Sequence, residues 1–178
     1  MSTIDITLAT PTPDDGLAVW QLVRDTGVLD VNSSYAYVAH FRHFAESCVV
    51  ARAEGAVVGF VMGYRLPARP DTYFLWQVGV SAAARGQGLA TRALRLLITH
   101  LFADGFHRVK ARVDPRNTAS LRLFDRLGFR REGHERLCYW DAEHGEWTDE
   151  VLFAVLSSEW RRQVLPSAHQ PLGDECGP

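Results

Sequence analysis

The segment from Trp76 to Ala90 reads WQVGVSAAARGQGLA, and it decides the fold. Its first five residues place apolar side chains at alternate positions, a pattern that predicts a strand. Two glycines, Gly86 and Gly88, come next, and the leucine spacing from there to Ala103 predicts an amphipathic helix. A strand that leads through a glycine turn into a helix presents backbone amides and the positive end of the helix dipole. This arrangement suits a pyrophosphate.

Two common phosphate-binding motifs do not fit this turn. The GxxxxGK[ST] pattern is absent, and Thr91 stands where a dinucleotide-binding fingerprint has its third glycine. A nucleotide-binding protein is also disfavoured because the turn contains no lysine. The alternative to a ligand site is that the glycines only mark the start of the helix.

The rest of the chain predicts strands and helices around this segment. The predicted strands are 4–8, 48–53, 56–64, 73–80, 108–113, 129–140 and 150–156. The predicted helices begin after Thr12, after Ser33 or Ser34, near Leu89 and at Asn117, and Pro67 and Pro70 predict a loop. This order predicts a mixed α/β fold around one sheet. We expect one domain over residues 1–160 and a disordered tail over 161–178.

The composition excludes several classes of function. The chain has 19 basic and 21 acidic residues, a near-balance that is not typical of nucleic-acid-binding proteins. With 47% hydrophobic residues it can form a core, and no apolar run approaches the roughly 20 residues that a bilayer requires. Because the first residues also lack the features of a signal peptide, we expect a soluble cytoplasmic protein without nucleic-acid or membrane partners.

The cysteines and histidines predict no metal site. Three cysteines are widely spaced, and none of the seven histidines belongs to an HExxH pattern. His40 and His43 are expected on a solvated face of a helix. Glu132 and Glu135 are three residues apart on one strand, so they are expected to point to opposite faces of the sheet.

Two motifs resemble signatures of the GNAT superfamily of acyl-CoA-dependent N-acyltransferases. Arg85 to Ala90 reads RGQGLA and resembles Q/R-x-x-G-x-G/A. Asn117 to Phe129 reads NTASLRLFDRLGF and resembles N-x-x-A/S-x-x-[LF]-[YF]-x-x-x-G-F. The resemblance implies the GNAT fold, a single mixed and mostly antiparallel sheet of about seven strands with about four helices. It also implies that the sheet is splayed between its fourth and fifth strands.

The same resemblance implies which positions bind acetyl-CoA, the acyl-donating co-substrate. The backbone amides of one turn would hold its pyrophosphate: Arg85, Gly86, Gln87, Gly88, Leu89 and Ala90. Val78 and Val80 would pair through their backbones with the pantetheine arm, and Asn117 would hydrogen-bond this arm or order the adjoining loop. An amide at Val78 or close by would polarise the thioester carbonyl as an oxyanion donor.

Phe124 departs from the pattern of the superfamily. Many members have a tyrosine at this coenzyme-binding position, and its hydroxyl protonates the leaving thiolate. Phenylalanine cannot donate a proton. A thiol has a pKa of about 8.5, so the thiolate can leave without a dedicated acid, or water can serve.

The N-terminal half resembles more narrowly the L-2,4-diaminobutyrate acetyltransferases of ectoine biosynthesis. The matching runs are Asp14 to Gly16, Leu29 to Tyr37, Gly59 to Tyr64 and Trp76 to Val78. A diamino acid carries two ammonium groups, and the resemblance implies that Asp30 pairs with one of them. Asn32 and Tyr35 would supply hydrogen bonds, and Trp76 would offer its ring face for a cation–π contact.

The C-terminal third supports this narrower match less well. Glu150 is kept, but Trp147 stands where that enzyme type has a histidine. The acceptor can therefore also be another small amine or a protein N-terminus. A further alternative is a catalytically silent acyl-CoA-binding module, and the superfamily's frequent dimerisation makes a homodimer an open alternative to a monomer.

The acceptor amine must lose a proton before it attacks. A primary amine has a pKa of about 10.4, so it is almost entirely an ammonium ion at neutral pH. No histidine lies in a motif that marks it as a base. We therefore expect Glu150 to accept the proton directly or through a water, with Tyr35 or a water chain as the alternative.

Overall fold

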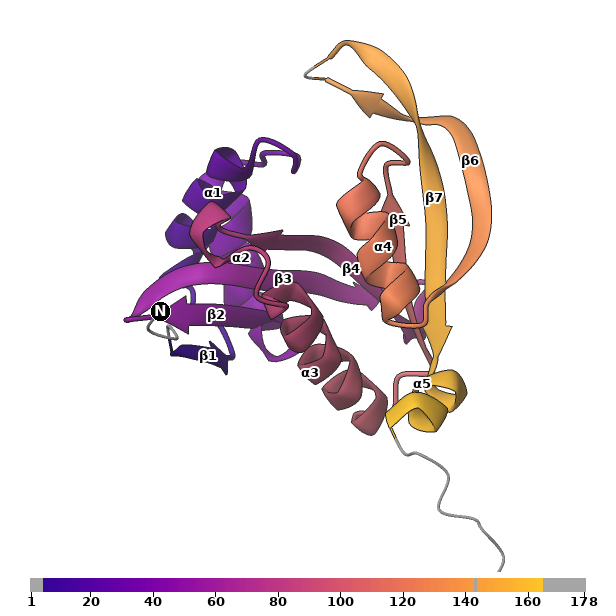
Figure 1. Cartoon of the computed structure of the whole chain (residues 1–178), viewed down its shortest axis with the longest axis horizontal. Helices are drawn as coiled ribbons and strands as arrows, with labels where there is room; N and C mark the ends of the chain where they lie inside the picture. The colour runs from indigo at the N-terminus through magenta and orange to yellow at the C-terminus, as the bar shows by residue number, and fades with distance from the viewer. Residues whose placement is uncertain (1–4, 143, 165–178) are drawn as a thin grey trace, which may run out of the picture.

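The computed structural model describes residues 5–142 and 144–164. Within these residues a seven-stranded sheet has the order β1-β2-β3-β4-β5-β7-β6 (Figure 1). The strands are β1 (Ile6–Ala9), β2 (Val49–Ala53), β3 (Ala56–Leu66), β4 (Arg69–Val80), β5 (Arg108–Val113), β6 (Arg130–Asp141) and β7 (Glu146–Leu156). Neighbouring strands are antiparallel except β4 and β5, which are parallel. The predicted mixed, mostly antiparallel sheet is confirmed.

Helices lie on both faces of this sheet. They are α1 (Asp15–Thr26), α2 (Ser34–Phe44), α3 (Leu89–Ala103), α4 (Thr118–Arg126) and α5 (Ser157–Val164), with short 3-10 turns η1 (Ala45–Ser47) and η2 (Ala82–Ala84). On β3, Phe60 and Met62 pack in the cluster under α1 and α2, whereas Val61 packs in the cluster under α3. Because successive strand residues point to opposite faces, α1 and α2 cover one face and α3 the other.

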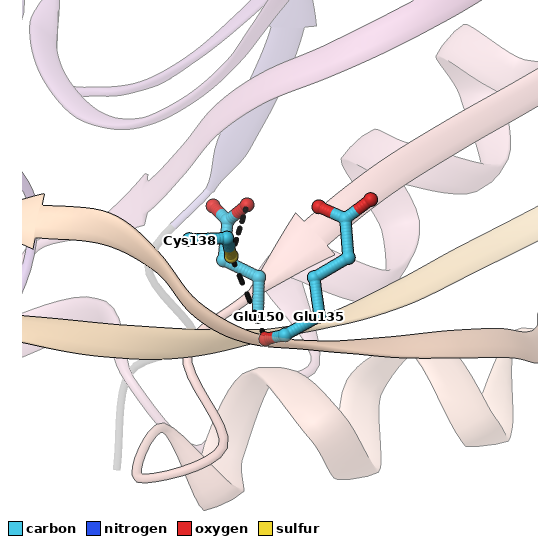
Figure 2. Close-up of side chains that lie close together, drawn as sticks. All are labelled: Glu135, Cys138 and Glu150. Atoms are coloured by element: carbon cyan, nitrogen blue, oxygen red, sulfur yellow. Dashed lines mark hydrogen bonds between the residues drawn. The ribbon is translucent and has the colours of Figure 1, made fainter.

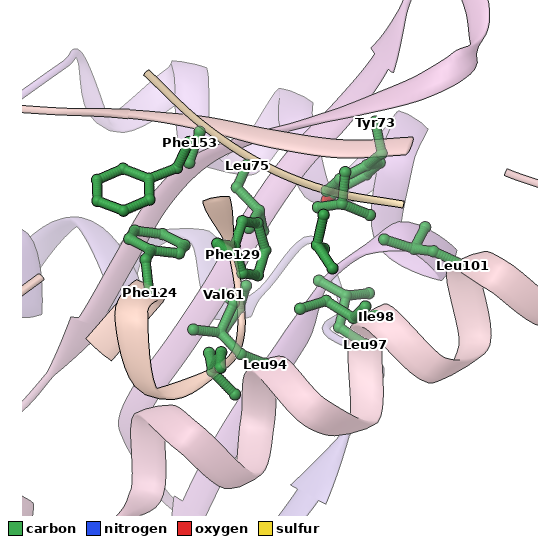
Figure 3. Close-up of a cluster of buried hydrophobic side chains, with 14 of the residues drawn as sticks. Val61, Tyr73, Leu75, Leu94, Leu97, Ile98, Leu101, Phe124, Phe129 and Phe153 are labelled. Carbon is green, nitrogen blue, oxygen red and sulfur yellow. The ribbon is translucent and has the colours of Figure 1, made fainter. Parts of the chain in front are cut away.

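The larger core lies between the sheet and the two helices α3 and α4. Figure 3 shows leucines of α3 facing β-strand side chains such as Val61 and Leu75. Phe124 of α4 belongs to this core, with its ring centroid 5.4 Å from that of Phe153 and 5.0 Å from that of Phe129. The face of the sheet that carries α3 and α4 is therefore closed by packing.

The sheet opens between β4 and β5. The two strands pair only from Thr72 to Leu75 and from Arg108 to Ala111, although β4 continues to Val80. We call the unpaired region beyond Leu75 the β4–β5 opening. It confirms the predicted splay between the fourth and fifth strands.

A β-bulge at Trp76 accompanies the opening. Met62 of β3 faces Gln77 and the next residue, Gly63, faces Leu75, so Trp76 is an extra residue in β4. A bulge bends its strand and shifts the alternation of side chains by one. As a result, Leu75 packs in the α3 cluster, whereas Trp76 packs in the α1–α2 cluster and Gln77 hydrogen-bonds α2.

Several sequence expectations need correction. β4 begins at Arg69, so Pro70 lies in the strand rather than in a loop. α1 begins at Asp15, whose carboxylate accepts hydrogen bonds from the backbone N–H and the hydroxyl of Thr12. α5 was not predicted, and it crosses the domain boundary expected at residue 160; residues 165–178 of the predicted tail lie outside the described residues.

A second bulge explains why the expectation for two glutamates is wrong. On β6, Arg131 faces Phe153 and Gly133 faces Leu152, so Glu132 is an extra residue. Glu132 pairs with Arg108, and Glu135 pairs with Arg112, two arginines four residues apart on β5. Strand residues four apart share a face, so the two carboxylates lie on the same side of the sheet.

None of the helices in the described part of the chain has both the length and the apolar character that a bilayer crossing demands.

Candidate active site

The backbone carbonyl of Asp30 is fixed at the bulge of β4. It accepts a hydrogen bond from Gln77 Nε2 at 2.8 Å and one from Asn32 Nδ2 at 3.4 Å. The Tyr37 hydroxyl lies 3.1 Å from Gln77 Oε1 and 3.4 Å from the Asp30 carbonyl, and its single proton can be donated to either oxygen. Tyr37 and Gln77 are both buried. The loop between α1 and α2 is therefore held rigidly against β4, and it presents the exposed Asp30 carboxylate.

Trp76 lies in an aromatic cluster beside this loop. Its ring is parallel to that of Tyr37 within 7°, with centroids 6.5 Å apart, and it lies 5.6 Å from the ring of His40. His40 is buried, contrary to its predicted solvated position, and its Nε2 lies 2.8 Å from the Gly63 carbonyl. Burial lowers the pKa of His40, and a neutral ring that carries its proton on Nε2 donates to that carbonyl.

The parts of β6 and β7 that extend beyond β5, residues 135–141 and 146–150, lie on the β5 side of the β4–β5 opening. We call them the distal part of β6 and β7. Figure 1 shows these strands projecting beyond the rest of the sheet. Burial and the hydrogen bond and charge of the Asp30 carboxylate raise the pKa of Tyr139 to about 12, and the charge of Glu150 adds to the effect. Tyr139 is therefore a neutral hydroxyl at neutral pH, and it lies beside the Asp30 carboxylate of the first half.

Glu150 lies in a cluster of charged groups on β5, β6 and β7. Arg112 Nη1 is 2.7 Å from Glu150 Oε2 and 2.9 Å from Glu135 Oε2. Figure 2 shows the Glu135 and Glu150 side chains next to each other with Cys138, whose Sγ lies 3.7 Å from Glu150 Oε2. The Sγ and the two carboxylates lie within 4.8 Å of one another, a spacing that would fit a cation. Because Arg112 already supplies a positive charge there, we interpret the cluster as an ion-paired one.

The glycine turn between β4 and α3 is open to solvent. Gly86 and Gly88 have φ angles of +77° and +71°, a conformation that favours glycine, and no atom of the described part of the chain lies within 4 Å of a Cβ built on either. α3 begins at Leu89 without a side-chain cap, so its first amides are available to a ligand. Arg85 Nε donates to the Val80 carbonyl at 3.2 Å, which ties the turn to the end of β4.

The loop before α4 connects the core to the distal β6–β7 strands. The Asn117 side chain accepts a hydrogen bond from the Ser120 amide at 3.0 Å and so caps α4. Arg116, its neighbour, contacts Asp141 at 3.1 Å and Glu146 at 2.8 Å. Of the two predicted roles of Asn117, the ordering of this loop has direct geometric support.

Comparisons with known proteins agree with this architecture. The sequence profile of the acetyltransferase (GNAT) family matches residues 17–129. The chain belongs to the GNAT acetyltransferase family. Two L-2,4-diaminobutyric acid acetyltransferases, from Methylotuvimicrobium alcaliphilum and Halomonas elongata, are 43% and 46% identical to it. The aligned stretches cover 68% and 67% of this chain, and 71% and 63% of those relatives.

Solved structures share the fold of this GNAT acetyltransferase. Diaminobutyrate acetyltransferase EctA from Paenibacillus lautus, in complex with L-2,4-diaminobutyric acid and coenzyme A, is 33% identical with a TM-score of 0.71. The match covers 87% of this chain and 96% of that one. The acetyltransferase yncA from Salmonella typhimurium has a TM-score of 0.75 at 20% identity, over 93% and 99% of the two chains, and supports the fold alone.

The structure of this GNAT acetyltransferase brings most of the predicted acceptor residues together. Asp30, Asn32 and Trp76 lie at the bulge, Tyr139 of β6 lies beside Asp30, and Glu150 is held by Arg112. Tyr35 is 76% exposed and has no hydrogen bond or ring contact among the described residues. Helix positions two apart differ by roughly 200°, so the buried residue of this pair is Tyr37.

Sequence reasoning missed four residues of this site: Tyr37, Gln77, Arg112 and Tyr139. Gln77 carried a signal, because a glutamine between apolar strand residues is a polar group that needs a partner. The ring of Tyr37 lies in the core, but its hydroxyl reaches Gln77. Tyr139 and Arg112 gave no local signal, since their partners are distant in sequence.

Proposed function

We propose that this chain transfers the acetyl group of acetyl-CoA to one primary amine of L-2,4-diaminobutyrate. The observation that carries the proposal is that the exposed Asp30 carboxylate and the Trp76 ring lie at the bulge of β4, while the Glu150 carboxylate is held by Arg112 at the end of the β4–β5 pairing. These groups complement a small molecule with two ammonium groups. The identity of 43% and 46% to enzymes named for this substrate supports the same acceptor.

The coenzyme fits two features of this chain. The exposed amides from Arg85 to Ala90 and the uncapped start of α3 suit a pyrophosphate, and a Cβ at Gly86 or Gly88 would face open space. Among the residues that the structure describes, no strand pairs with the edge of β4 at Val78 and Val80 on the β5 side, so its backbone groups can pair with the pantetheine arm. The bound coenzyme would supply the acetyl thioester that the amine attacks.

Acceptor binding is assigned to the loop between α1 and α2 that carries Asp30 and to the bulged part of β4 that holds it, which together we call the rigid wall. Its carbonyl is held by Gln77 and Asn32, so its carboxylate is oriented toward one ammonium group without a large entropic cost. Trp76 is held by Tyr37 and His40 and offers a ring face to a cation. Tyr35 is exposed, so its hydroxyl is accessible and stays a predicted hydrogen-bonding group for the acceptor.

Proton transfer is assigned to Glu150. The carboxylate accepts one proton from the reacting ammonium, directly or through a water. The neutral amine then forms the C–N bond while the C–S bond breaks, and the nitrogen releases its second proton to solvent. A backbone amide at Val78 is the proposed oxyanion donor. Phe124 is buried among Phe129 and Phe153, so this side chain donates no proton and the thiolate is protonated by solvent.

An amine panel tests the proposed function. The purified chain is incubated with acetyl-CoA and L-2,4-diaminobutyrate, ornithine, lysine, 1,3-diaminopropane or a peptide with a free N-terminus, and free thiol is measured. The highest kcat/KM is expected for L-2,4-diaminobutyrate, and NMR of the product identifies which amine is acetylated. A higher value for the peptide would transfer the assignment to protein N-termini. Coenzyme A binding without thiol release for any amine would favour a silent binding module. The cytoplasmic location and the homodimer stay predictions.

A further inference from the structure

Arg112 occupies a distinctive position at the β4–β5 opening. It follows Ala111, the last residue of β5 that pairs with β4. Val109, Ala111 and Val113 pack in the core under α3 and α4, so Arg112 points to the opposite face, on which α1 and α2 lie. The side chain of Arg112 is therefore on the side of the sheet that carries Asp30 and Glu150.

Only part of the Arg112 guanidinium is used by the protein. Nη1 contacts Glu150 at 2.7 Å and Glu135 at 2.9 Å. Across residues 5–142 and 144–164, Nη2 and Nε have no hydrogen-bond or ion-pair partner, and the side chain is 36% exposed. A guanidinium has five N–H donors in a planar fork, so donors of Arg112 remain for another acceptor. The two glutamates fix the orientation of the fork.

The charges of the site match those of a diamino acid when Arg112 is included. Asp30, Glu135 and Glu150 are three carboxylates that can face ammonium groups, but a diamino acid also carries a carboxylate. Arg108 pairs with Glu132, and Lys110 lies where β5 is still paired with Phe74 of β4. At the opening itself, Arg112 is a cation with spare donors that can take a carboxylate bidentately.

We propose that Arg112 determines specificity for an amino-acid acceptor by binding the carboxylate of the substrate through its Nη2 and Nε donors. The inference rests on the proposed function and extends it, because it distinguishes a diamino acid from a simple diamine. A purely structural role of Arg112 as the partner of Glu150 and Glu135 predicts a different result. In that case its loss alters the reaction of every amine by the same factor.

The test compares two acceptors that differ only in the carboxylate. L-2,4-diaminobutyrate without its carboxylate is 1,3-diaminopropane, and kcat/KM is measured for both with acetyl-CoA. The ratio of interest is kcat/KM for L-2,4-diaminobutyrate divided by kcat/KM for 1,3-diaminopropane. Arg112→Gln is expected to lower this ratio by about 10- to 100-fold, because a hydrogen bond to a charged group is lost for L-2,4-diaminobutyrate only. Any disturbance of Glu150 lowers both values and cancels in the ratio. Arg112→Lys, which keeps the charge without the fork, is expected to recover part of the ratio.

Arg108→Gln is the matched control. It removes an arginine that pairs with a β6 glutamate on the same face of β5, but within the closed part of the sheet. Its ratio is expected to equal that of the wild type. An unchanged ratio in Arg112→Gln would overturn the inference and leave the proposed function intact, as would a wild-type enzyme that accepts both amines equally. A wild-type enzyme that acetylates neither amine would overturn the proposed function, and the inference with it.

Discussion

Around Asp30 the chain positions polar groups by burial, whereas around Glu150 it positions them by ion pairs between exposed strands. Gln77 and Tyr37, which hold the Asp30 carbonyl, are 5% and 0% exposed, and no charged group takes part in that contact. Most residues of β6 are exposed, and its glutamates face arginines of β5. Buried hydrogen bonds fix geometry strongly, while exposed ion pairs contribute about 0–1 kcal/mol each.

The site therefore has one rigid side, the rigid wall of the α1–α2 loop and β4, and one adjustable side, the distal part of β6 and β7, which we call the second wall. The wall from α1 to β4 can tolerate few substitutions, since its polar groups would lose their partners in the interior. The distal part of β6 and β7 can exchange surface charges at little cost in stability. It is also the region in which the sequence departs from the pattern of the diaminobutyrate enzymes, at Trp147. Differences in acceptor choice are therefore expected to arise from this second wall.

The largest expected effect is loss of stability at Gly63. A Cβ there would lie 2.2 Å from the Phe74 carbonyl oxygen and 2.7 Å from the Tyr73 hydroxyl, so Gly63→Ala requires the backbone to move. We expect the free energy of unfolding to fall by about 3 kcal/mol or more, measured by denaturant titration. Gly133→Ala in β6 is the counterpart, where the Cβ meets the flexible end of Leu152 at 3.2 Å. Equal losses for both variants would contradict the contrast between the walls.

Removal of the proposed base is expected to have the next largest effect. Glu150→Gln should lower kcat by about 10²–10⁴-fold, because a positioned base contributes that much. The remaining rate should rise with pH, as free amine replaces the missing base. Glu132→Gln, which removes another arginine-paired carboxylate of the same face, is expected to leave kcat unchanged. Wild-type kcat in Glu150→Gln at neutral pH would exclude this residue as the base.

Coenzyme binding should depend on the glycine turn. Gly88→Glu places a side chain and a negative charge where the pyrophosphate is proposed to bind, and we expect the Kd for coenzyme A to rise about tenfold or more. Gly105→Glu is the control for backbone strain, since Gly105 has a φ of +89° and lies beyond the other end of α3. Calorimetry on both variants separates the two causes, and a Kd that changes equally in both would argue against the turn as the binding site.

The smallest expected effect is a pH dependence from His40. Burial lowers the pKa of His40 below its ordinary value of about 6.5, so the unfolded chain takes up this proton first as the pH falls. The stability that His40 contributes is present above pH 6.5 and is lost as the pH falls from there toward the lower folded-state pKa. His40→Gln should reduce this loss relative to the wild type in unfolding curves at several pH values. His134→Gln, on the exposed strand β6, is expected not to reduce this loss of stability.

The fold was predictable where a local pattern determines it. The strand from Arg108 to Val113 and the helix from Leu89 to Ala103 match their predictions, because apolar periodicity and glycine boundaries mark both. The bulge at Trp76 was not predictable, since an extra residue depends on the partner strand. For the same reason the face of Glu132 was misjudged.

The candidate site was predictable only as far as its motifs reach. Asp30, Trp76 and Glu150 were found through resemblance, whereas Tyr139, which lies beside Asp30, is marked by no motif. Tyr35 and Tyr37 lie in the same helix turn, and only the packing direction of α2 shows that Tyr37 is the buried one; the role of Tyr35 toward the substrate stays a prediction. Arg112 could be found only from a pairing between strands that are distant in sequence.

The bulge at Trp76 separates what the fold requires from what the site requires. Deletion of Trp76 would place Gln77 directly after Leu75, so β4 would pair regularly with β3 and the side chains from Gln77 to Val80 would keep their present faces. The ring that packs beside Tyr37 and His40 would be lost. In a library of single-residue deletions in β4, loss of Trp76 is therefore expected to leave the chain folded and to impair the acceptor site.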